Sequence, residues 1–306
     1  MQIQWYPGHM YKAGKEIKKT LANIDLIIEI IDARLPFSSE NPKLAELRGD
    51  KPCIKLLSKS DLADESITQR WQQYFEQQRD VKTLAISSFQ PEKAQQIPNL
   101  CRKMLPHKRA DKTINVLIMG IPNVGKSTLI NLLAGRTIAK TGNEPAVTKM
   151  QQRIDLKNGV VLFDTPGMMW PNVENKNSGY RLATTGAIKD TALKHDDVAF
   201  FAAEYLLEAY PEAVMERYQL ESLPKNEAEL MDAIGKRRGC LRAGKQIDLD
   251  KTAKILLAEL RAGTLGAISY ETPEMIEVEM AELEIIREQK AAKKASGKKK
   301  SSRKRR

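Results

Sequence analysis

The sequence predicts an α/β domain with a mostly parallel sheet flanked by helices, followed by a small all-helical domain. In the first half of the chain, short apolar runs alternate with helical patterns, which is typical of βαβ units. One of these runs, 113–120, is almost continuously apolar, as expected for a strand buried on both faces. Beyond about residue 178 amphipathic helical patterns dominate.

The expected strands are short and rich in Ile, Leu and Val, and they lie at 25–32, 53–57, 83–87, 113–120, 151–156 and 159–164. The last two form a hairpin, because Asn158-Gly159 between them is a strong turn signal. Helices are expected at 64–79, 92–105, 126–135, 196–209, 226–238, 249–262 and 274–292. We therefore predict an α/β domain over 1–175, a helical domain over 176–290 and a disordered basic tail over 291–306.

The basic charge of the chain is concentrated at one end. The net charge is +11, and residues 287–306 contain eleven Lys or Arg and one Glu. The rest of the chain is therefore nearly neutral. A tail of this composition is expected to be disordered when free and to bind RNA phosphates. A second basic segment, 235–245, contacts RNA or forms a solvated face.

Cysteine use and hydropathy limit the class of protein. The three cysteines are widely separated and form no C-x-x-C pair, which argues against a zinc site or a disulfide framework. No apolar run follows the first charged residues, and the apolar stretch 26–32 is too short to span a bilayer. We therefore expect a cytoplasmic protein without membrane contact.

The segment "GIPNVGKS" (120–127) matches the phosphate-loop pattern G-x-x-x-x-G-K-[ST] between an expected strand and an expected helix. Gly125 allows the loop backbone to approach phosphate oxygens, Lys126 neutralises them and the Ser127 hydroxyl ligates Mg²⁺. The alternative is a glycine turn without a ligand. The residues expected to contact phosphate are Asn123, Val124, Gly125, Lys126, Ser127 and Thr128.

A second phosphate-site motif, "DTPG" (164–167), ends the last expected strand. Asp164 is placed to hold Mg²⁺ through water, and the Gly167 N–H to sense a γ-phosphate. Thr148, in the polar region between the two motifs, is the candidate to close over Mg²⁺ and the γ-phosphate. Thr141 is a weaker competitor, and a plain loop threonine is the alternative.

The segment "KLLSKSDL" (55–62) ends a strand with a Lys-x-Asp turn. Asp61 can accept two hydrogen bonds from guanine, which adenine cannot supply, and a buried polar partner rejects the wrong base strongly. The Lys59 stem can lie along the base, and Ser87-Ser88 after the next strand can bring an N–H group near guanine O6. Alone, this turn would be read as solvated; beside a phosphate loop it predicts a guanine site.

The order of these motifs along the chain resembles that of the circularly permuted GTPases, in which the base-reading turn precedes the phosphate loop. Three segments, "WYPGHM" (5–10), "DARLPFSSENP" (32–42) and "IPNVGKST" (121–128), are most similar to the RbgA (YlqF) family of ribosome-biogenesis GTPases. The resemblance covers roughly residues 3–290. It implies a circularly permuted P-loop GTPase domain followed by a helical RNA-binding domain.

The resemblance also implies a function. It implies GTP as substrate and a role in late maturation of the large ribosomal subunit, in contact with its precursor rRNA and ribosomal proteins; we expect the protein to act as a monomer. Three alternatives stay open. The first is a P-loop enzyme with another chemistry, such as an ATPase. The second is an RNA-binding P-loop protein for which nucleotide is a structural or regulatory ligand, and the third is a permuted GTPase that acts on another ribosomal particle.

Met168 stands where many GTPases carry the Gln that orients the attacking water. Slow intrinsic hydrolysis, stimulated by ribosomal particles, is therefore expected. The resemblance implies that Asn123 supports a K⁺ ion and that His9 acts in catalysis; the alternative for His9 is packing beside its aromatic and proline neighbours. Ser58 replaces the usual Asn of the base-reading turn, so we expect guanine specificity with modest affinity.

Overall fold

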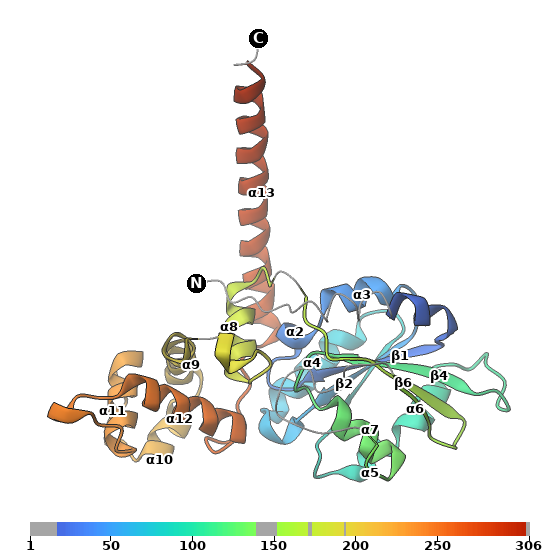
Figure 1. Ribbon diagram of the computed structural model, residues 1–306, viewed down its shortest axis with the longest axis horizontal. Helices are drawn as coiled ribbons and strands as arrows, with labels where there is room; N and C mark the ends of the chain where they lie inside the picture. The colour runs from blue at the N-terminus through green and yellow to red at the C-terminus, as the bar shows by residue number, and fades with distance from the viewer. Residues whose placement is uncertain (1–16, 139–151, 171–172, 193, 304–306) are drawn as a thin grey trace.

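The computed structural model describes residues 17–138, 152–170, 173–192 and 194–303. Figure 1 shows an α/β part built on one sheet, a group of helices beside it, and a long helix that projects from the junction of the two parts. None of the described helices combines the length and the apolar composition that crossing a bilayer requires.

The sheet contains strands β1 (Leu26–Asp32), β2 (Cys53–Ser58), β3 (Val81–Ala85), β4 (Ile114–Gly120), β5 (Gln152–Asp155) and β6 (Val160–Asp164). Their spatial order is β3-β2-β1-β4-β6-β5. All neighbouring pairs are parallel except β5 and β6, which form the expected antiparallel hairpin. The mostly parallel sheet is thus confirmed. The strand order reverses between β1 and β4, and in α/β sheets ligands bind at such a switch point, beyond the carboxyl ends of the strands.

The centre of the sheet is buried on both faces. Every residue of β1 is buried, including the charged Glu29 and Asp32. Glu29 faces Lys55 of β2 in the strand register, and the Lys55 ammonium lies 2.8 Å from Glu29 and 2.6 Å from Glu40. These buried charges are tolerated because they are paired and hydrogen-bonded. Strand β2 can therefore carry a lysine in the core.

The helices that surround the sheet are α2 (Pro36–Ser39), α3 (Pro42–Arg48), α4 (Glu65–Glu76), α5 (Pro91–Ala94), α6 (Ile97–Lys103) and α7 (Lys126–Ala134). The single helix expected over 92–105 is divided into α5 and α6. Pro98 lies in the first turn of α6, where its missing N–H costs nothing, whereas within a continuous helix its ring would clash with the carbonyl of residue 94.

The helical part contains α8 (Lys176–Thr184), α9 (His195–Ala209), α10 (Pro211–Tyr218), α11 (Glu227–Arg237) and α12 (Leu249–Ala262). Its core is formed by the apolar faces of α9, α11 and α12, including Leu206, Leu230, Ile234, Leu256 and Leu260. The predicted α/β fold with a helical C-terminal part is confirmed, although α8 and α10 were not expected as helices.

Helix α13 (Pro273–Arg303) continues through the basic segment. The structure differs here from the disordered tail expected from residue 291. Residues 290–303 contain no proline and are rich in Lys and Ala, which favour helix. The backbone of the basic segment therefore extends the helix that starts at the junction of the two parts.

Both ends of the helical part are attached to the α/β part. It begins after β6, and it returns through residues 268–271, which precede α13. In this returning segment Ile268 N donates to Leu62 O (2.9 Å) and Tyr270 N donates to Arg34 O (2.7 Å). The Ser269 hydroxyl accepts a hydrogen bond from Asp64 N (3.1 Å). The returning segment therefore lies directly against the turn that follows β2.

Candidate nucleotide-binding site

The predicted motifs lie on one edge of the sheet. Strands β1, β2, β4 and β6 are parallel, so the base-reading turn, the phosphate loop and "DTPG" all begin at their carboxyl ends. The turn after β2 is also bonded to the turn after β3, since Ser60 N donates to Ile86 O (3.1 Å). Of the predicted site residues, His9 and Thr148 lie outside the described part of the chain; the others are gathered on this edge.

The phosphate loop runs from the end of β4 to the start of α7. A Cβ at Gly120 would lie 2.6 Å from the Ile30 carbonyl oxygen of β1, so only glycine lets the loop begin this close to the neighbouring strand. Gly125, with φ of 102°, is the N-cap of α7. The first N–H groups of a helix have no intrahelical acceptor and favour an anion. The loop geometry therefore suits phosphate.

Lys126 and Asp164 are the two buried charged residues of the phosphate site. The Lys126 ammonium donates to Ile121 O (3.0 Å) and Gly120 O (3.3 Å) and is buried. Burial lowers the pKa of Lys126 to about 8, against the opposing charge of Asp164. Burial likewise raises the pKa of Asp164 to about 6, with Lys126 opposing the shift. A bound magnesium–phosphate group would favour the charged forms of both side chains.

The donor set fits Mg²⁺. Asp164 Oδ1 is buried and has no hydrogen-bond partner among the described residues, and Ser127 lies on the first turn of α7. Within the described residues no group of three or more His, Cys, Asp or Glu could hold a metal ion. A hydroxyl and a single carboxylate, completed by water and phosphate oxygens, are the usual Mg²⁺ ligands at a nucleotide. Ser127 and Asp164 would hold the ion here.

The raised pKa of Asp164 predicts a pH dependence. Its carboxyl group is protonated below about pH 6, so its ionisation destabilises the nucleotide-free protein as the pH rises through that value, whereas Mg²⁺-nucleotide stabilises the ionised form. We therefore expect Mg²⁺-dependent GDP affinity to rise between pH 5 and pH 7, as measured by fluorescence titration. In Asp164→Asn the affinity is lower and the rise is smaller, because only the ionisation of the terminal phosphate of GDP remains. An unchanged pH profile in the variant would contradict the assignment.

The "DTPG" turn contacts the phosphate loop. A Cβ at Gly167 would lie 3.0 Å from Pro122 Cα and 3.1 Å from the Lys126 ammonium, and Met168 N donates to Gly120 O (3.1 Å). The Thr165 hydroxyl donates to Ile118 O (2.8 Å) of β4. The structure thus brings Gly167 beside Lys126, as contact with a γ-phosphate requires.

Met168 is buried rather than directed to the solvent. Its carbonyl oxygen accepts a hydrogen bond from the Asn41 side-chain amide (2.8 Å), and Asn41 is itself fully buried. Sequence reasoning missed Asn41, although Asn before Pro42 is a helix N-cap signal, and its side chain does cap α3. No side chain at position 168 is available to orient an attacking water.

The base-reading turn is tied to the phosphate loop by Ser58. The Ser58 hydroxyl lies 2.6 Å from Val124 O and 3.0 Å from Ile31 O, so it can donate to the loop carbonyl. Ser58, which replaces the usual Asn at this position, therefore still connects the turn to the phosphate loop. Asp61 is exposed in the short 3₁₀ turn Ser60–Leu62, where its carboxylate can meet a base.

The serine turn after β3 is only partly buried. Ser87 is buried and its hydroxyl accepts a hydrogen bond from Phe89 N (3.2 Å), whereas Ser88 is exposed. The bond between the turns after β2 and β3 keeps this serine turn next to Lys59 and Asp61. The predicted base-binding residues are therefore neighbours in the structure.

Asp32 and Arg34 are site residues that sequence reasoning did not assign. Asp32 ends β1 and pairs with Arg34 (2.8 Å) and with the Lys59 ammonium (2.9 Å). Burial alone would raise the pKa of Asp32, but Arg34 and Lys59 hold it well below its usual range. The available signal was an Asp at the end of a mostly apolar strand with an Arg two residues later, where unpaired charges are costly.

A cleft of about 490 Å³ opens beside the base-reading turn, between the α/β and helical parts. Arg34, Lys59 and Asn123 line one side, and Gly186 and Arg261 line the other. Asn123, at φ of 58° in the phosphate loop, donates from its side-chain amide to Gly186 O (2.8 Å). The phosphate loop is therefore bonded directly to the helical part.

Comparisons with known proteins show which GTPases the chain resembles. A family model described as RsgA GTPase matches residues 12–174, and one described as 50S ribosome-binding GTPase matches residues 115–236. The chain is 45% identical to Ribosome biogenesis GTPase A of Bacillus cereus over 297 residues, which are 94% of this chain and 100% of that protein. It is 30% identical to the protein of that name from Thermotoga maritima, with 90% and 96% covered.

The fold is similar to a solved structure as well. GNP-bound YlqF from T. maritima superposes with a TM-score of 0.61 at 27% identity, covering 86% of this chain and 99% of that one. Its similarity extends over both parts of the molecule. The site residues, the permuted order of their motifs and these relatives lead to the same conclusion. The chain is a GTPase and belongs to the ribosome biogenesis GTPase A family.

Proposed function

We propose that this GTPase is a cytoplasmic assembly factor that acts, as a monomer, in late maturation of the large ribosomal subunit. One observation carries the proposal: the base-reading turn, the phosphate loop and the "DTPG" turn lie together on one edge of the sheet, and the chain then continues into a helical part. The names of its relatives, and the description of one matching family model as a 50S ribosome-binding GTPase, support the choice of particle.

In this proposal each part of the nucleotide has its own set of residues. The base is bound by Ser58, Lys59, Asp61, Ser87 and Ser88. The phosphates are bound by Asn123, Val124, Gly125, Lys126, Ser127, Thr128 and Gly167. Mg²⁺ is held by Ser127, Asp164 and Thr148. Thr148 is proposed on the sequence pattern alone, because it lies outside the described residues.

GTP hydrolysis needs a further catalytic group besides these residues, because Met168 is buried and cannot orient the attacking water. We propose that Asn123 supports a K⁺ ion, which would stabilise the charge that develops in the transition state. The bond from Asn123 to Gly186 O fixes the orientation of the amide that would face the ion. His9 is proposed as a further catalytic group from the family resemblance.

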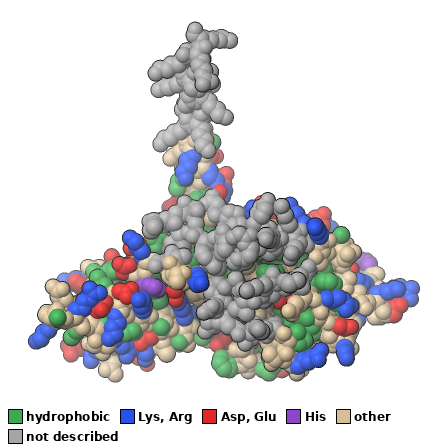
Figure 2. Space-filling view, viewed as in Figure 1, with side chains coloured by type: hydrophobic (Ala, Val, Ile, Leu, Met, Phe, Trp, Pro, Cys, Tyr) green, Lys and Arg blue, Asp and Glu red, His purple; other side chains and the backbone are tan. Residues whose placement is uncertain are grey.

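Contact with RNA is proposed for the basic end of α13 and for the segment 235–245. Much of that segment is already paired: Lys236 lies 2.5 Å from Asp232, Arg238 2.6 Å from Glu259 and Arg242 3.0 Å from Asp248. Figure 2 shows Lys and Arg interspersed with Asp and Glu over the helical part. The end of α13, where basic residues greatly outnumber acidic ones, is therefore the stronger candidate for binding phosphates.

GTP turnover with purified ribosomal particles tests the proposal. In K⁺ buffer we expect large subunits to raise turnover by about tenfold or more, on the scale of other charge-stabilising groups, and Na⁺ buffer to reduce the stimulated rate. Small subunits are the matched control. Equal stimulation by both particles would contradict the choice of the large subunit and favour action on another ribosomal particle. No stimulation by either would favour the alternative in which the nucleotide is a structural ligand.

A further inference from the structure

We propose that Asp32, oriented by Arg34, is a positioning residue for guanine recognition: it holds the Lys59 ammonium away from Asp61 and thereby leaves the Asp61 carboxylate free for the base. The inference deepens the proposed nucleotide site and rests on the base-reading roles of Lys59 and Asp61. It assigns a purpose to a buried cluster of charges at the end of the central strand β1, next to the cleft.

The carboxylate of Asp32 is held in one orientation. Arg34 binds it in a bidentate manner, with Nε 2.9 Å from Oδ1 and Nη2 2.8 Å from Oδ2, and Arg34 N donates to Oδ1 as well (3.1 Å). Bidentate pairing fixes geometry as well as charge. In the strand register Asp32 lies opposite Ser58, directly before Lys59. The fixed carboxylate is therefore within reach of the base-reading turn.

Lys59 occupies a backbone conformation that needs support. Its φ of 57° and ψ of 36° are left-handed, a conformation that costs free energy for a residue with a side chain. Its ammonium lies 2.9 Å from Asp32 Oδ2 with only 27% of the side chain exposed. Burial lowers the pKa of Lys59, and Asp32 is the main charge that opposes this. The ion pair holds both the turn and the direction of the alkyl stem.

Asp61 is the competing partner. Its charge also acts on Lys59, yet Asp61 is exposed and makes no ion pair within 4 Å with any described residue. Guanine offers two N–H donors to such a carboxylate, and an ammonium bound there would take the same lone pairs. By accepting the Lys59 ammonium, Asp32 prevents this self-pairing. The site is thus already arranged for the base before the nucleotide binds.

A double-mutant cycle on GDP affinity tests the inference. We expect Asp32→Asn to weaken GDP binding by about tenfold or more, because the substitution removes the carboxylate charge and one of its two accepting oxygens, and Lys59 is released. Binding of magnesium tripolyphosphate, which has no base, stays the same. In a Lys59→Met background, Asp32→Asn has less than about a twofold further effect. This non-additivity is a readout that a merely structural role would not give.

The possible outcomes are distinct. Equal losses from Asp32→Asn with and without Lys59 would overturn the positioning role. Unchanged GDP affinity in Lys59→Met would instead overturn the proposed base-reading role of that lysine. Arg34→Lys is the second variant, should Asp32→Asn not fold: it keeps the charge but loses the bidentate geometry, and a partial loss of GDP affinity without loss of tripolyphosphate binding is expected, whereas no loss would count against the inference.

A matched control is available in the helical part. Glu259 also holds arginines, with Arg217 at 2.8 Å and Arg238 at 2.6 Å, and it does not line the cleft beside the base-reading turn. Glu259→Gln should lower the melting temperature and leave GDP affinity unchanged. A loss of GDP affinity in this control equal to that of Asp32→Asn would show that destabilisation alone accounts for the effect, and would refute the proposal.

Discussion

Asp61→Asn is expected to change the preferred base from guanine to xanthine, by about 100-fold or more in relative affinity. A carboxylate accepts from both N–H donors of guanine, whereas xanthine presents one donor and one carbonyl, which an amide matches with an acceptor and a donor. Asp61 is exposed and makes no ion pair with any described residue. The substitution should therefore alter recognition without disturbing the fold.

Competition between GDP and XDP for the variant measures this exchange. Asp64→Asn is the matched control, because Asp64 lies close by but caps α4, where its side chain accepts from Ser66 N (2.8 Å) and Ile67 N (3.2 Å). The control should change stability slightly and leave the base preference intact. A persistent preference of Asp61→Asn for guanine would mean that this turn does not read the base.

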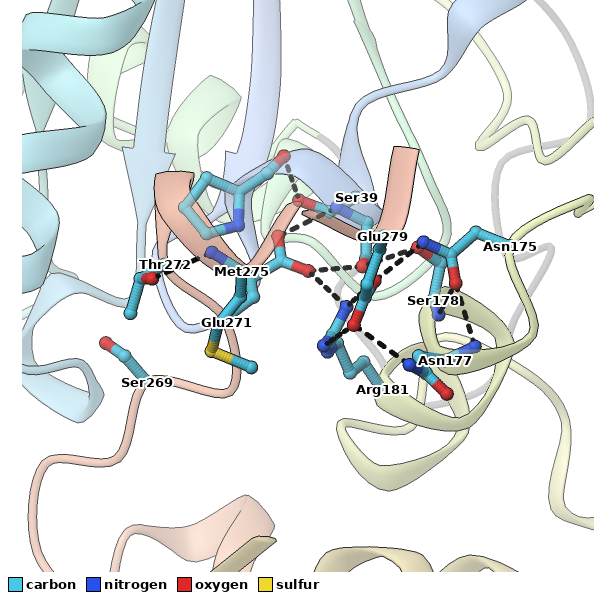
Figure 3. A network of polar contacts seen from close by, with 12 residues as sticks. Ser39, Asn175, Asn177, Ser178, Arg181, Ser269, Glu271, Thr272, Met275 and Glu279 are labelled. Carbon is cyan, nitrogen blue, oxygen red and sulfur yellow. Dashed lines mark hydrogen bonds and ion pairs between the residues drawn. The ribbon is translucent and has the colours of Figure 1, made fainter. Parts of the chain in front are cut away.

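Glu271→Ala is expected to lower the free energy of unfolding by about 3–5 kcal/mol, as found when one partner of a buried ion pair is removed. Glu271 is fully buried. It accepts hydrogen bonds from Ser38 N (2.9 Å) and from the Ser38 hydroxyl, and Arg181 of α8 lies 3.5 Å away. Figure 3 shows how this network joins α2, α8 and the start of α13. Without Glu271, the ion-pair partner left to Arg181 among the described residues is Glu279, at 2.6 Å.

Urea unfolding followed by tryptophan fluorescence checks this result, because the Trp71 indole donates to Glu271 O (3.1 Å) and reports on the junction. Glu274→Ala is the control. Glu274 pairs with Arg70 on the surface, where both side chains are largely exposed, and such pairs contribute less than about 1 kcal/mol. Equal destabilisation by the two substitutions would show that the buried network adds nothing beyond an exposed pair.

The parts of the molecule that were predictable from the sequence are those set by local chemistry. The expected strands are present within a few residues. For β1, β2, β4 and β6 the reason is that an apolar run between turn signals is itself the cause of a buried strand. The phosphate loop is equally local, since Gly120, Gly125 and Lys126 lie within a few residues of one another. The continuation of α13 through its basic end was the main departure in secondary structure.

The features that were not predictable depend on contacts between distant segments. Glu271 meets Ser38 from 233 positions away, and Asn41 meets Met168 from 127 positions away. A buried Glu or Asn in a single sequence does not identify its partner. The importance of Asp32 was likewise hidden, because its partner Lys59 lies 27 positions away in the sequence and is brought beside it only by the pairing of β1 and β2. The roles of His9 and Thr148 stay predictions.

The attachment of the helical part at both ends restricts how it can move. Helices α8 to α12 begin after the "DTPG" turn and end at residues 268–271, which are bonded to the base-reading side of the site. Two fixed attachments leave rotation about the line between them as the main motion open to the helical part. The bond from Asn123 to Gly186 O opposes that rotation, so a nucleotide that moves the phosphate loop acts directly on the contact that sets the angle of the helices.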